Sequence, residues 1–225
     1  MIRIFGTLPN KVLGIFGTNI LKISGVSTSW ITQTGGITTI SDNFDNYTVG
    51  NLAGQGNWLA AQNNMAIVDV SGNKQVTPVS GARSLLYRSE IFTDNHYSQI
   101  TIKSIASGSF VGVVVRSTLS AGTGFGYAYY ADSTQRYLKY FNVASGTTGS
   151  TIANIIGTTN AVNDVLRLEV SGSTLKCYKN GALDTGLTGG TGIFTNTAIP
   201  SGGTPGIFGY TVGSSNIDTW SGDNI

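Results

Sequence analysis

The chain of 225 residues has little cysteine, histidine, proline or charge, and several of these scarcities exclude a class of function. Cys177 is its single cysteine, so an intrachain disulfide and a cysteine-based zinc site are both excluded. His96 is its single histidine, and no serine in a glycine-flanked elbow accompanies it, which argues against a nucleophilic triad. We expect Cys177 to be a small buried side chain and His96 to lie in a solvated loop.

Charge and long apolar runs are equally sparse. Charged residues make up 11% of the chain and the net charge is +2, with the basic residues scattered, so no nucleic acid partner is expected. No window approaches a run of about 18 apolar residues, the length of a membrane span. The N-terminus, MIRIFGTLPNKVLG, lacks the continuous apolar core of a signal peptide, so we expect folding in a cytoplasm and no membrane partner.

A repeat of 11 residues opens the chain: IFGTLPNKVLG at 4–14, IFGTNILKISG at 15–25 and, more loosely, VSTSWITQTGG at 26–36. Each unit is too small to bury its own apolar face, so such units stack or associate with a partner. We therefore expect residues 1–36 to form a docking or oligomerisation arm. The residues expected to supply its apolar contacts are Ile4, Phe5, Val12, Ile15, Phe16, Ile20, Ile23, Val26 and Trp30.

Residues 37–225 have the composition of one all-β domain, with many glycines and short alternating runs. In NDVLRLEVSGSTLKCYKNGAL (163–183), apolar and polar residues alternate on both sides of a tight turn, which predicts a hairpin over a core. Asn180-Gly181 then favours a type I′ turn. Both faces are apolar through most of Ser109–Arg116, which predicts a central strand. The clearest expected strands are Ala66–Val70, Ser84–Ile91, Tyr97–Ile105, Ser109–Arg116, Phe125–Ala131, Tyr137–Val143, Val165–Val170 and Leu175–Lys179.

Several strings in this domain resemble the concanavalin A-like lectin and glucanase family, which includes laminin-G-like sugar-binding modules. They are DNFDNYTVGNLAGQGNW (42–58), NDVLRL (163–168), VSGSTLKCYKNG (170–181), IPSGGTPGIFGY (199–210) and NIDTW (216–220). The resemblance spans about residues 41–221 and implies an antiparallel β-sandwich, or jelly roll, for residues 37–225. In that fold the first and last strands lie side by side, which would place Phe44-Asp45 near Ile217-Asp218.

The arm carries a second resemblance. KVLGI (11–15) and KISGV (22–26) are similar to short repeats at the N-termini of tailed-phage structural proteins, where they precede such sandwiches. The combination implies a virion component: a fibre, spike or decoration protein. Its implied partners are other virion proteins, of the capsid or the tail, and further copies of itself in a homo-oligomer.

Catalysis and metal binding find little support in the residues. A glycosidase needs two carboxylates facing each other, about 5–5.5 Å apart in retaining enzymes. The Glu-x-Asp-x-x-Glu pattern of the family's glucanases is missing, and Glu90 and Glu169 are the only glutamates, so no catalytic residue is assigned. No cofactor is expected; the alternative is a calcium site shared by Asp45 and Asp218, which otherwise cap turns.

Aromatic residues are the remaining candidates for ligand binding, because an exposed tyrosine can stack on a sugar ring and hydrogen-bond to it. Phe125, Tyr127 and Tyr129 share one face of a predicted strand, and Tyr130 lies on the other. The glycan-binding candidates are Tyr130, Arg136 and Tyr140, whereas Phe125, Phe141, Trp58 and Trp220 are expected in the core.

The sequence thus favours a non-enzymatic phage virion structural protein, anchored by its arm and exposing a sandwich to host or environmental glycans. Two alternatives remain open. One is a stand-alone carbohydrate-binding or adhesion module, in which the arm only trimerises the sandwich. The other is a glycoside hydrolase, which would need a pair of catalytic carboxylates that no pattern in the sequence indicates.

Overall fold

The protein was analysed as a computed structural model, which describes residues 39–79, 81, 83–120, 123–142, 149–210 and 214–225. All regular secondary structure in these residues is β, and they contain no helix that could cross a membrane. The arm predicted over residues 1–36 lies outside the described residues, so its docking contacts and the domain boundary after it stay predictions.

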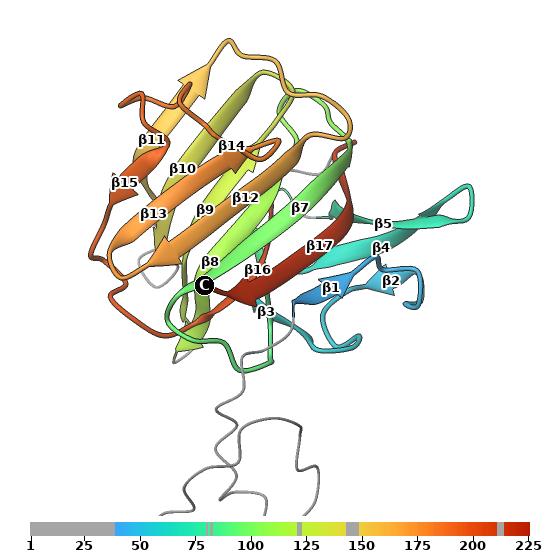
Figure 1. Cartoon of the computed structure of the whole chain (residues 1–225). Coiled ribbons are helices and arrows are strands. Elements are labelled where there is room, and N and C mark those ends of the chain that lie inside the picture. The colour runs from blue at the N-terminus through green and yellow to red at the C-terminus, as the bar shows by residue number, and fades with distance from the viewer. Residues whose placement is uncertain (1–38, 80, 82, 121–122, 143–148, 211–213) are drawn as a thin grey trace, which may run out of the picture. The chain divides into compact units, whose positions relative to one another are not determined.

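The strands form two antiparallel sheets stacked face to face (Figure 1). The seven-stranded sheet has the order β11 (Ser150–Ile156), β10 (Gln135–Asn142), β9 (Thr123–Ala131), β8 (Phe110–Ser120), β16 (Thr204–Tyr210), β6 (Ser84–Arg88) and β3 (Trp58–Gln62). The ten-stranded sheet has the order β14 (Ala182–Leu183), β13 (Thr174–Lys179), β12 (Val165–Ser171), β7 (His96–Ser104), β17 (Asn216–Asn224), β5 (Asn73–Pro78), β4 (Met65–Val70) and β2 (Gly50–Asn51), with β1 (Ile40–Asp42) on β17 and β15 (Ile193–Thr195) on β13.

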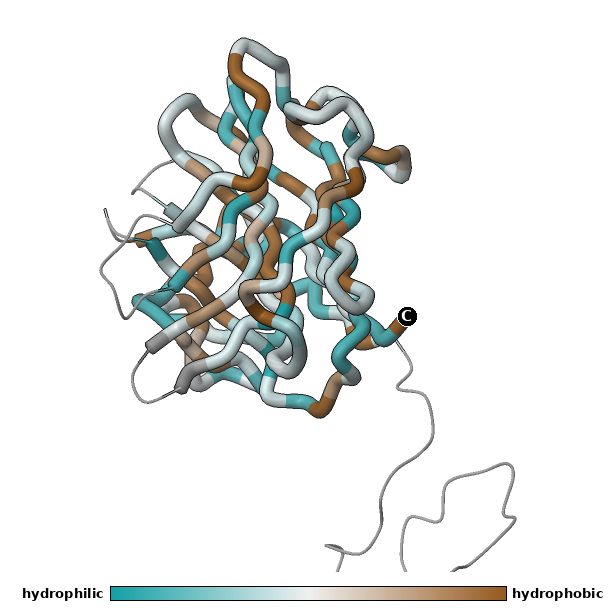
Figure 2. Tube along the Cα trace, turned by 90° about the vertical axis from the view of Figure 1, so that its left-hand side faces the viewer, coloured by the Kyte–Doolittle hydropathy of each residue, from teal (hydrophilic) through white to brown (hydrophobic). Residues whose placement is uncertain are grey.

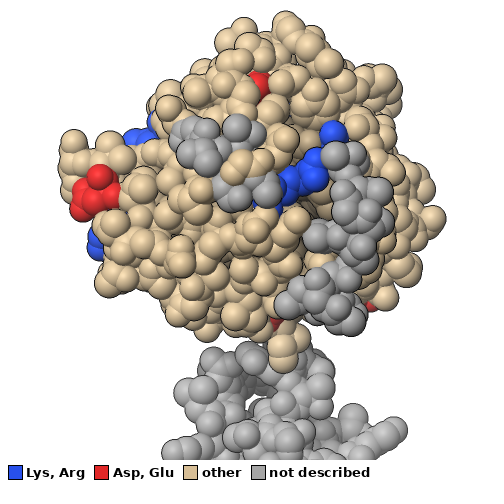
Figure 3. All heavy atoms as spheres, turned by 180° about the vertical axis from the view of Figure 1, so that it is seen from behind, with Lys and Arg blue, Asp and Glu red and all other residues tan. Residues whose placement is uncertain are grey.

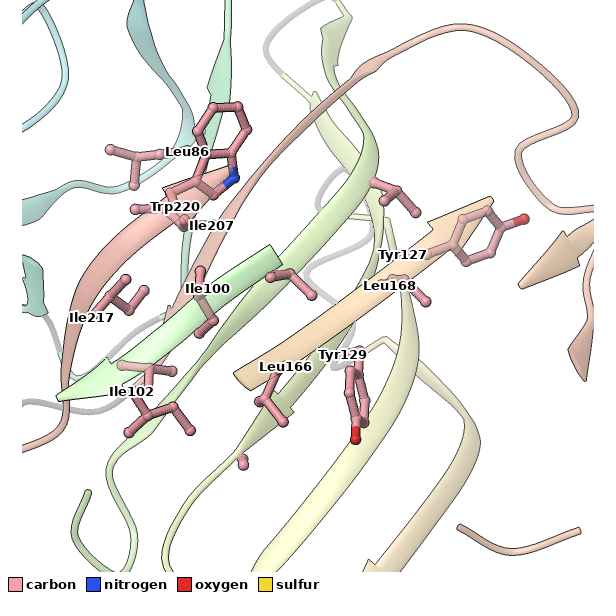
Figure 4. Packing of buried hydrophobic residues seen from close by; sticks show 14 of the residues in the cluster. Leu86, Ile100, Ile102, Tyr127, Tyr129, Leu166, Leu168, Ile207, Ile217 and Trp220 are labelled. Atoms are coloured by element: carbon pink, nitrogen blue, oxygen red, sulfur yellow. The ribbon is translucent and has the colours of Figure 1, made fainter. Parts of the chain in front are cut away.

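The main core lies between the sheets, because each strand turns alternate side chains inward. Along the tube of Figure 2, hydrophobic and hydrophilic residues interchange within single strands. Figure 4 shows Ile100 and Leu168 of the ten-stranded sheet and Ile207 and Tyr129 of the seven-stranded sheet among the side chains that fill this space. The architecture is a jelly-roll β-sandwich of the concanavalin A-like type, as the sequence resemblance implied.

All eight strands expected from the sequence are present, with ends displaced by a few residues. The predicted hairpin is β12 and β13, in register from Leu166–Lys179 to Ser171–Thr174. Asn180 and Gly181 have φ values of 53° and 81°, the positive pair that a type I′ turn requires. The strand predicted to be central is β8, fourth of seven in its sheet.

The first and last strands of the sandwich pair, as the resemblance implied: Asp42 of β1 lies opposite Trp220 of β17. Trp58 and Trp220 are both buried, and their rings meet edge to face with centroids 5.1 Å apart. Cys177 is buried as well. These tryptophan and cysteine predictions are confirmed.

The expectation for His96 is wrong. It begins strand β7 and is 0% exposed. Its Nε2 accepts a hydrogen bond from the backbone N–H of Arg116 at 3.0 Å, and its Nδ1 lies 2.7 Å from the carbonyl oxygen of Thr93. These partners place the proton on Nδ1 and select the neutral ring. Burial, and secondarily the nearby Arg116 charge, lower its pKa to about 4.

Candidate binding face

An aromatic cluster covers the outer face of the seven-stranded sheet, on the side away from the main core. Its rings come from β6, β8, β9, β10 and β16, so segments distant in sequence meet on one surface. We call this surface the aromatic face; its rings are Tyr87, Phe110, Tyr130, Tyr137, Phe141, Phe208 and Tyr210.

A glycine makes the centre of the aromatic face flat. Gly112 of β8 lies opposite Tyr130 of β9 on one side and opposite Phe208 of β16 on the other. Because Gly112 has no side chain, the rings of Tyr130 and Phe208 stack across it with centroids 4.4 Å apart and planes inclined by 29°. Phe141 extends this stack, with its centroid 5.2 Å from that of Phe208.

The aromatic face has a dry centre and a tyrosine rim. Tyr130 is 5% exposed, and Phe141 and Phe208 are fully buried beneath their neighbours. Tyr87, Tyr137 and Tyr210 are only half-buried, so their edges reach solvent. Half-exposed tyrosines around an apolar floor provide stacking area together with hydroxyl groups.

Two cations lie on these rings. The guanidinium of Arg83 is 5.7 Å from the centroid of Phe141 and 5.3 Å from that of Tyr210. The ammonium of Lys139 is 4.9 Å from the centroid of Tyr137. Partial burial, and then the charge of Arg83, lower the pKa of Lys139, so the two groups repel each other. In Figure 3, which looks at this side, Lys and Arg atoms extend over the middle of the surface and Asp and Glu atoms appear towards its edges.

Carboxylates are absent from the strands that build this face. The sequences of β3, β6, β8, β9, β10, β11 and β16 contain neither aspartate nor glutamate. All eleven acidic residues belong to the other sheet or to connecting segments. The aromatic face therefore has no acid pair of its own and carries positive charge.

The three glycan-binding candidates from the sequence do not lie together. Tyr130 belongs to the aromatic face, but Arg136 and Tyr140 of β10 turn towards the core between the sheets. The three candidates rest on exposure, and this expectation is wrong for two of them: Tyr130 is 5% and Arg136 is 4% exposed. Arg136 donates from Nε and Nη2 to the two oxygens of Asp184 at 2.7 and 2.8 Å. Arg136 thus stabilises the fold, and binding by Tyr130 remains a prediction.

The two acids considered for calcium have other partners. Asp45 accepts a hydrogen bond from the side chain of Asn43 at 2.8 Å, and Asp218 accepts one from Asn73 at 2.7 Å. Within the described residues, no group of three or more histidine, cysteine or acidic side chains is placed to hold a metal ion. The geometry fits their role in turns and cross-strand bonding.

A hollow of about 470 Å³ lies where β1 meets β17, apart from the aromatic face. Asp42, Arg88 and Trp220 are among the residues that line it. Oδ2 of Asp42 already accepts bonds from Trp58 Nε1 at 2.9 Å, Arg88 Nη1 at 3.1 Å and the Tyr47 hydroxyl at 2.5 Å. Because these polar groups satisfy one another, we interpret them as a structural network rather than a ligand site.

Arg83 and Lys139 were missed by sequence reasoning. Lys139 is two residues from Tyr137 and Phe141, so period-2 counting puts all three on one face. The same counting separates Lys139 from Arg136 and Tyr140. Arg83 directly precedes the strand β6 and follows no pattern, so no local signal indicates its position.

Comparison with solved structures supports the fold. The chain is similar to a β-glucanase of Bacillus licheniformis, with 13% identity over 86% of this chain and 100% of that one and a TM-score of 0.51. It is similar to the Crh5 transglycosylase, with 11% identity over 84% of this chain and 85% of that one and a TM-score of 0.52. It is also similar to the exoplasmic/lumenal domain of VIP36 in its Ca²⁺/Man-bound form, with 11% identity over 75% and 83% of the two chains and a TM-score of 0.51.

These identities are low, so the likeness concerns the sandwich itself. No protein-family model matches the sequence, and no curated protein matches it significantly.

Proposed function

We propose that the sandwich is a non-catalytic carbohydrate-binding module that holds a glycan across the aromatic face. The observation that carries this proposal is the position of three half-exposed tyrosines, Tyr87, Tyr137 and Tyr210, around a flat apolar floor. Sugar rings present apolar C–H faces and polar edges, and a tyrosine rim offers matching stacking area and hydroxyl groups.

The fold is compatible with this role. The similar structures include a β-glucanase, a transglycosylase and a domain in a Ca²⁺/Man-bound form, so sandwiches of this type act on or bind carbohydrates in other proteins. Their identities to this chain are 11–13%, and the ligand is therefore argued from the aromatic face alone.

The composition of the face supports binding without hydrolysis. Glycoside hydrolysis by the usual route needs an acid and a second carboxylate on either side of the scissile bond. The seven strands beneath the aromatic face supply no carboxylate. A glycan bound there would meet tyrosines and cations but no acid–base pair from the sheet.

Affinity electrophoresis in gels that contain single polysaccharides tests the proposal. A bound glycan retards the native protein, and we expect retardation by at least one polymer in a panel of neutral and charged glycans. In that polymer, Tyr137→Ala and Tyr210→Ala should each weaken binding about tenfold, the effect of losing about 1.4 kcal/mol from an aromatic contact.

The matched control is Tyr178→Ala. Tyr178 is a partly buried tyrosine on β13 of the other sheet, where it donates to Glu169 at 3.1 Å. Its loss should leave retardation unchanged. Equal weakening of binding by all three variants would show that the glycan does not bind at the aromatic face. Absence of retardation by every polysaccharide in the panel would refute the proposal.

A structural role in a virion is a second and more specific proposal, and it rests on the repeat over residues 4–36. In that case the arm would attach the protein to capsid or tail proteins, or to further copies of itself, and the sandwich would display its aromatic face from the particle. Several large apolar side chains, each worth about 1.5–3 kcal/mol when buried, would make such attachment durable.

Light scattering after size exclusion tests the arm. If it assembles subunits, the full chain forms an oligomer and a variant that lacks residues 1–36 is a monomer. Two monomers of equal stability would oppose an assembly role and leave the carbohydrate-binding module as the better account.

A further inference from the structure

The charged groups on the aromatic face are Arg83 and Lys139. They lie on the rings rather than beside them, since each centroid distance is 4.9–5.7 Å, within the range of cation–π contact. A ligand that approaches Tyr137 or Tyr210 therefore meets a cation together with the ring.

Neither cation has an acidic partner. Of the described lysines and arginines, Arg83 and Lys139 form no ion pair, and neither do Lys74, Arg116 and Lys176; the others pair with acidic side chains. All eleven acidic residues of the chain are described, and none lies on the strands of this sheet. What distinguishes Arg83 and Lys139 is that they share one surface, on a sheet whose strands hold no carboxylate to act as a counter-charge.

This arrangement is unfavourable without a ligand. Both groups are partly buried, which removes solvating water, and each repels the other. An anion near both groups would relieve the repulsion. The aromatic floor below would strengthen this attraction, because it lowers the local dielectric constant relative to water.

We infer that the ligand of the aromatic face is an anionic glycan, a polysaccharide with carboxylate or sulfate groups. This inference rests on the proposed carbohydrate-binding function and narrows it. The guanidinium of Arg83 can donate two parallel hydrogen bonds to an oxyanion, and Lys139 adds a point charge. The sugar ring that bears the anion would then contact the rim at Tyr137 or Tyr210.

Polymers that differ only in charge test the inference with the full chain. Polygalacturonate is compared with carboxyl-reduced polygalacturonate, and dextran sulfate with dextran, in affinity electrophoresis. We expect at least one anionic polymer to bind about tenfold more tightly than its neutral counterpart, the effect of a charge-assisted contact. The first pair reports carboxylate recognition and the second sulfate recognition.

Single-charge variants locate the effect. Arg83→Gln and Lys139→Gln should each weaken binding of the anionic polymer about fivefold to tenfold and reduce its dependence on salt. The matched control is Lys176→Gln, which removes one positive charge from β13 on the other sheet. It should leave binding unchanged, and thermal unfolding confirms that all three variants are folded.

The outcomes separate the two proposals. Equal binding to charged and neutral polymers, with losses in Tyr137→Ala, would overturn the anionic ligand and retain the binding module. Equal effects of Lys139→Gln and Lys176→Gln would show attraction by net charge alone and likewise overturn the inference. If no polymer binds, both proposals fail.

Discussion

Nη1 of Arg88 lies 3.1 Å from Oδ2 of Asp42, and this ion pair joins the seven-stranded sheet to the first strand of the ten-stranded sheet. The guanidinium also lies 5.0 Å from the Trp58 ring and 5.4 Å from the Trp220 ring. Glu90 accepts from Nε of the same arginine at 3.0 Å. One buried cation thus holds together two tryptophans and two acids from different parts of the chain.

We predict that Asp42→Ala lowers the free energy of unfolding by about 3 kcal/mol, the low end of the cost of breaking a buried ion pair, because Arg88 keeps Glu90 as a partner. The indole N–H of Trp58 would lose its acceptor as well. Equilibrium unfolding in urea measures the change. Asp69→Ala is the control, since exposed Asp69 caps a turn through Gly72 N–H at 2.7 Å and should cost about 1 kcal/mol. Equal losses in both variants would show that the network adds no particular stability.

The parts of the fold that could be predicted are those set by the alternation of apolar and polar residues and by turn residues close in sequence. The hairpin of β12 and β13 follows from alternation and two turns within about twenty residues, and pairing of neighbours in sequence needs no other information. The partners of Arg88 could not be found in this way: Asp42 precedes it by 46 residues, and the two meet only when both sheets are assembled.

The same limit applies to the candidate site: its local alternation could be predicted, but its contacts between distant residues could not. Period-2 counting correctly separates Tyr130 from Tyr129, but it does not say which of the two faces inward. The burial of Arg136 could not be predicted, because its partner Asp184 lies 48 residues away. The burial of His96 could not be predicted either, because its partner is the backbone of Arg116, on a strand of the opposite sheet.

Buried His96 makes stability depend on pH. Its pKa is about 4 in the folded protein and about 6.5 when unfolded, so the unfolded chain takes up a proton first as pH falls. The stability that the neutral, buried His96 contributes is therefore present in full above about pH 6.5 and is lost as the pH falls from about 6.5 to about 4. We expect a loss of about 2 kcal/mol between pH 7 and pH 5, measured by urea unfolding. In His96→Leu this slope should vanish; if it persists, another group causes it.

Cys177 should be inert in the native protein. Burial raises the pKa of its thiol well above the ordinary value, and its side chain is fully enclosed. We predict that a thiol reagent such as DTNB labels it at once in 6 M guanidinium chloride and only through unfolding in native buffer. The labelling rate should rise in Asp42→Ala about tenfold for each 1.4 kcal/mol of stability lost. Rapid labelling of the native wild-type protein would contradict the enclosed position.

Gly112 should be indispensable for both the fold and the aromatic face. A Cβ at this position would lie 2.3 Å from the Tyr129 carbonyl oxygen and 2.4 Å from Cβ of Tyr130, closer than any real contact. We predict that Gly112→Ala costs about 2–3 kcal/mol of stability, the upper part of the range for overpacking, and separates the rings of Tyr130 and Phe208. Gly126→Ala is the matched control on the neighbouring strand, because its nearest contact would be an ordinary 3.5 Å. Its stability should stay within about 1 kcal/mol of the wild type. Urea unfolding and glycan retardation of both variants provide the measurement. If Gly112→Ala matched Gly126→Ala in both, the stack across β8 would not depend on the missing side chain.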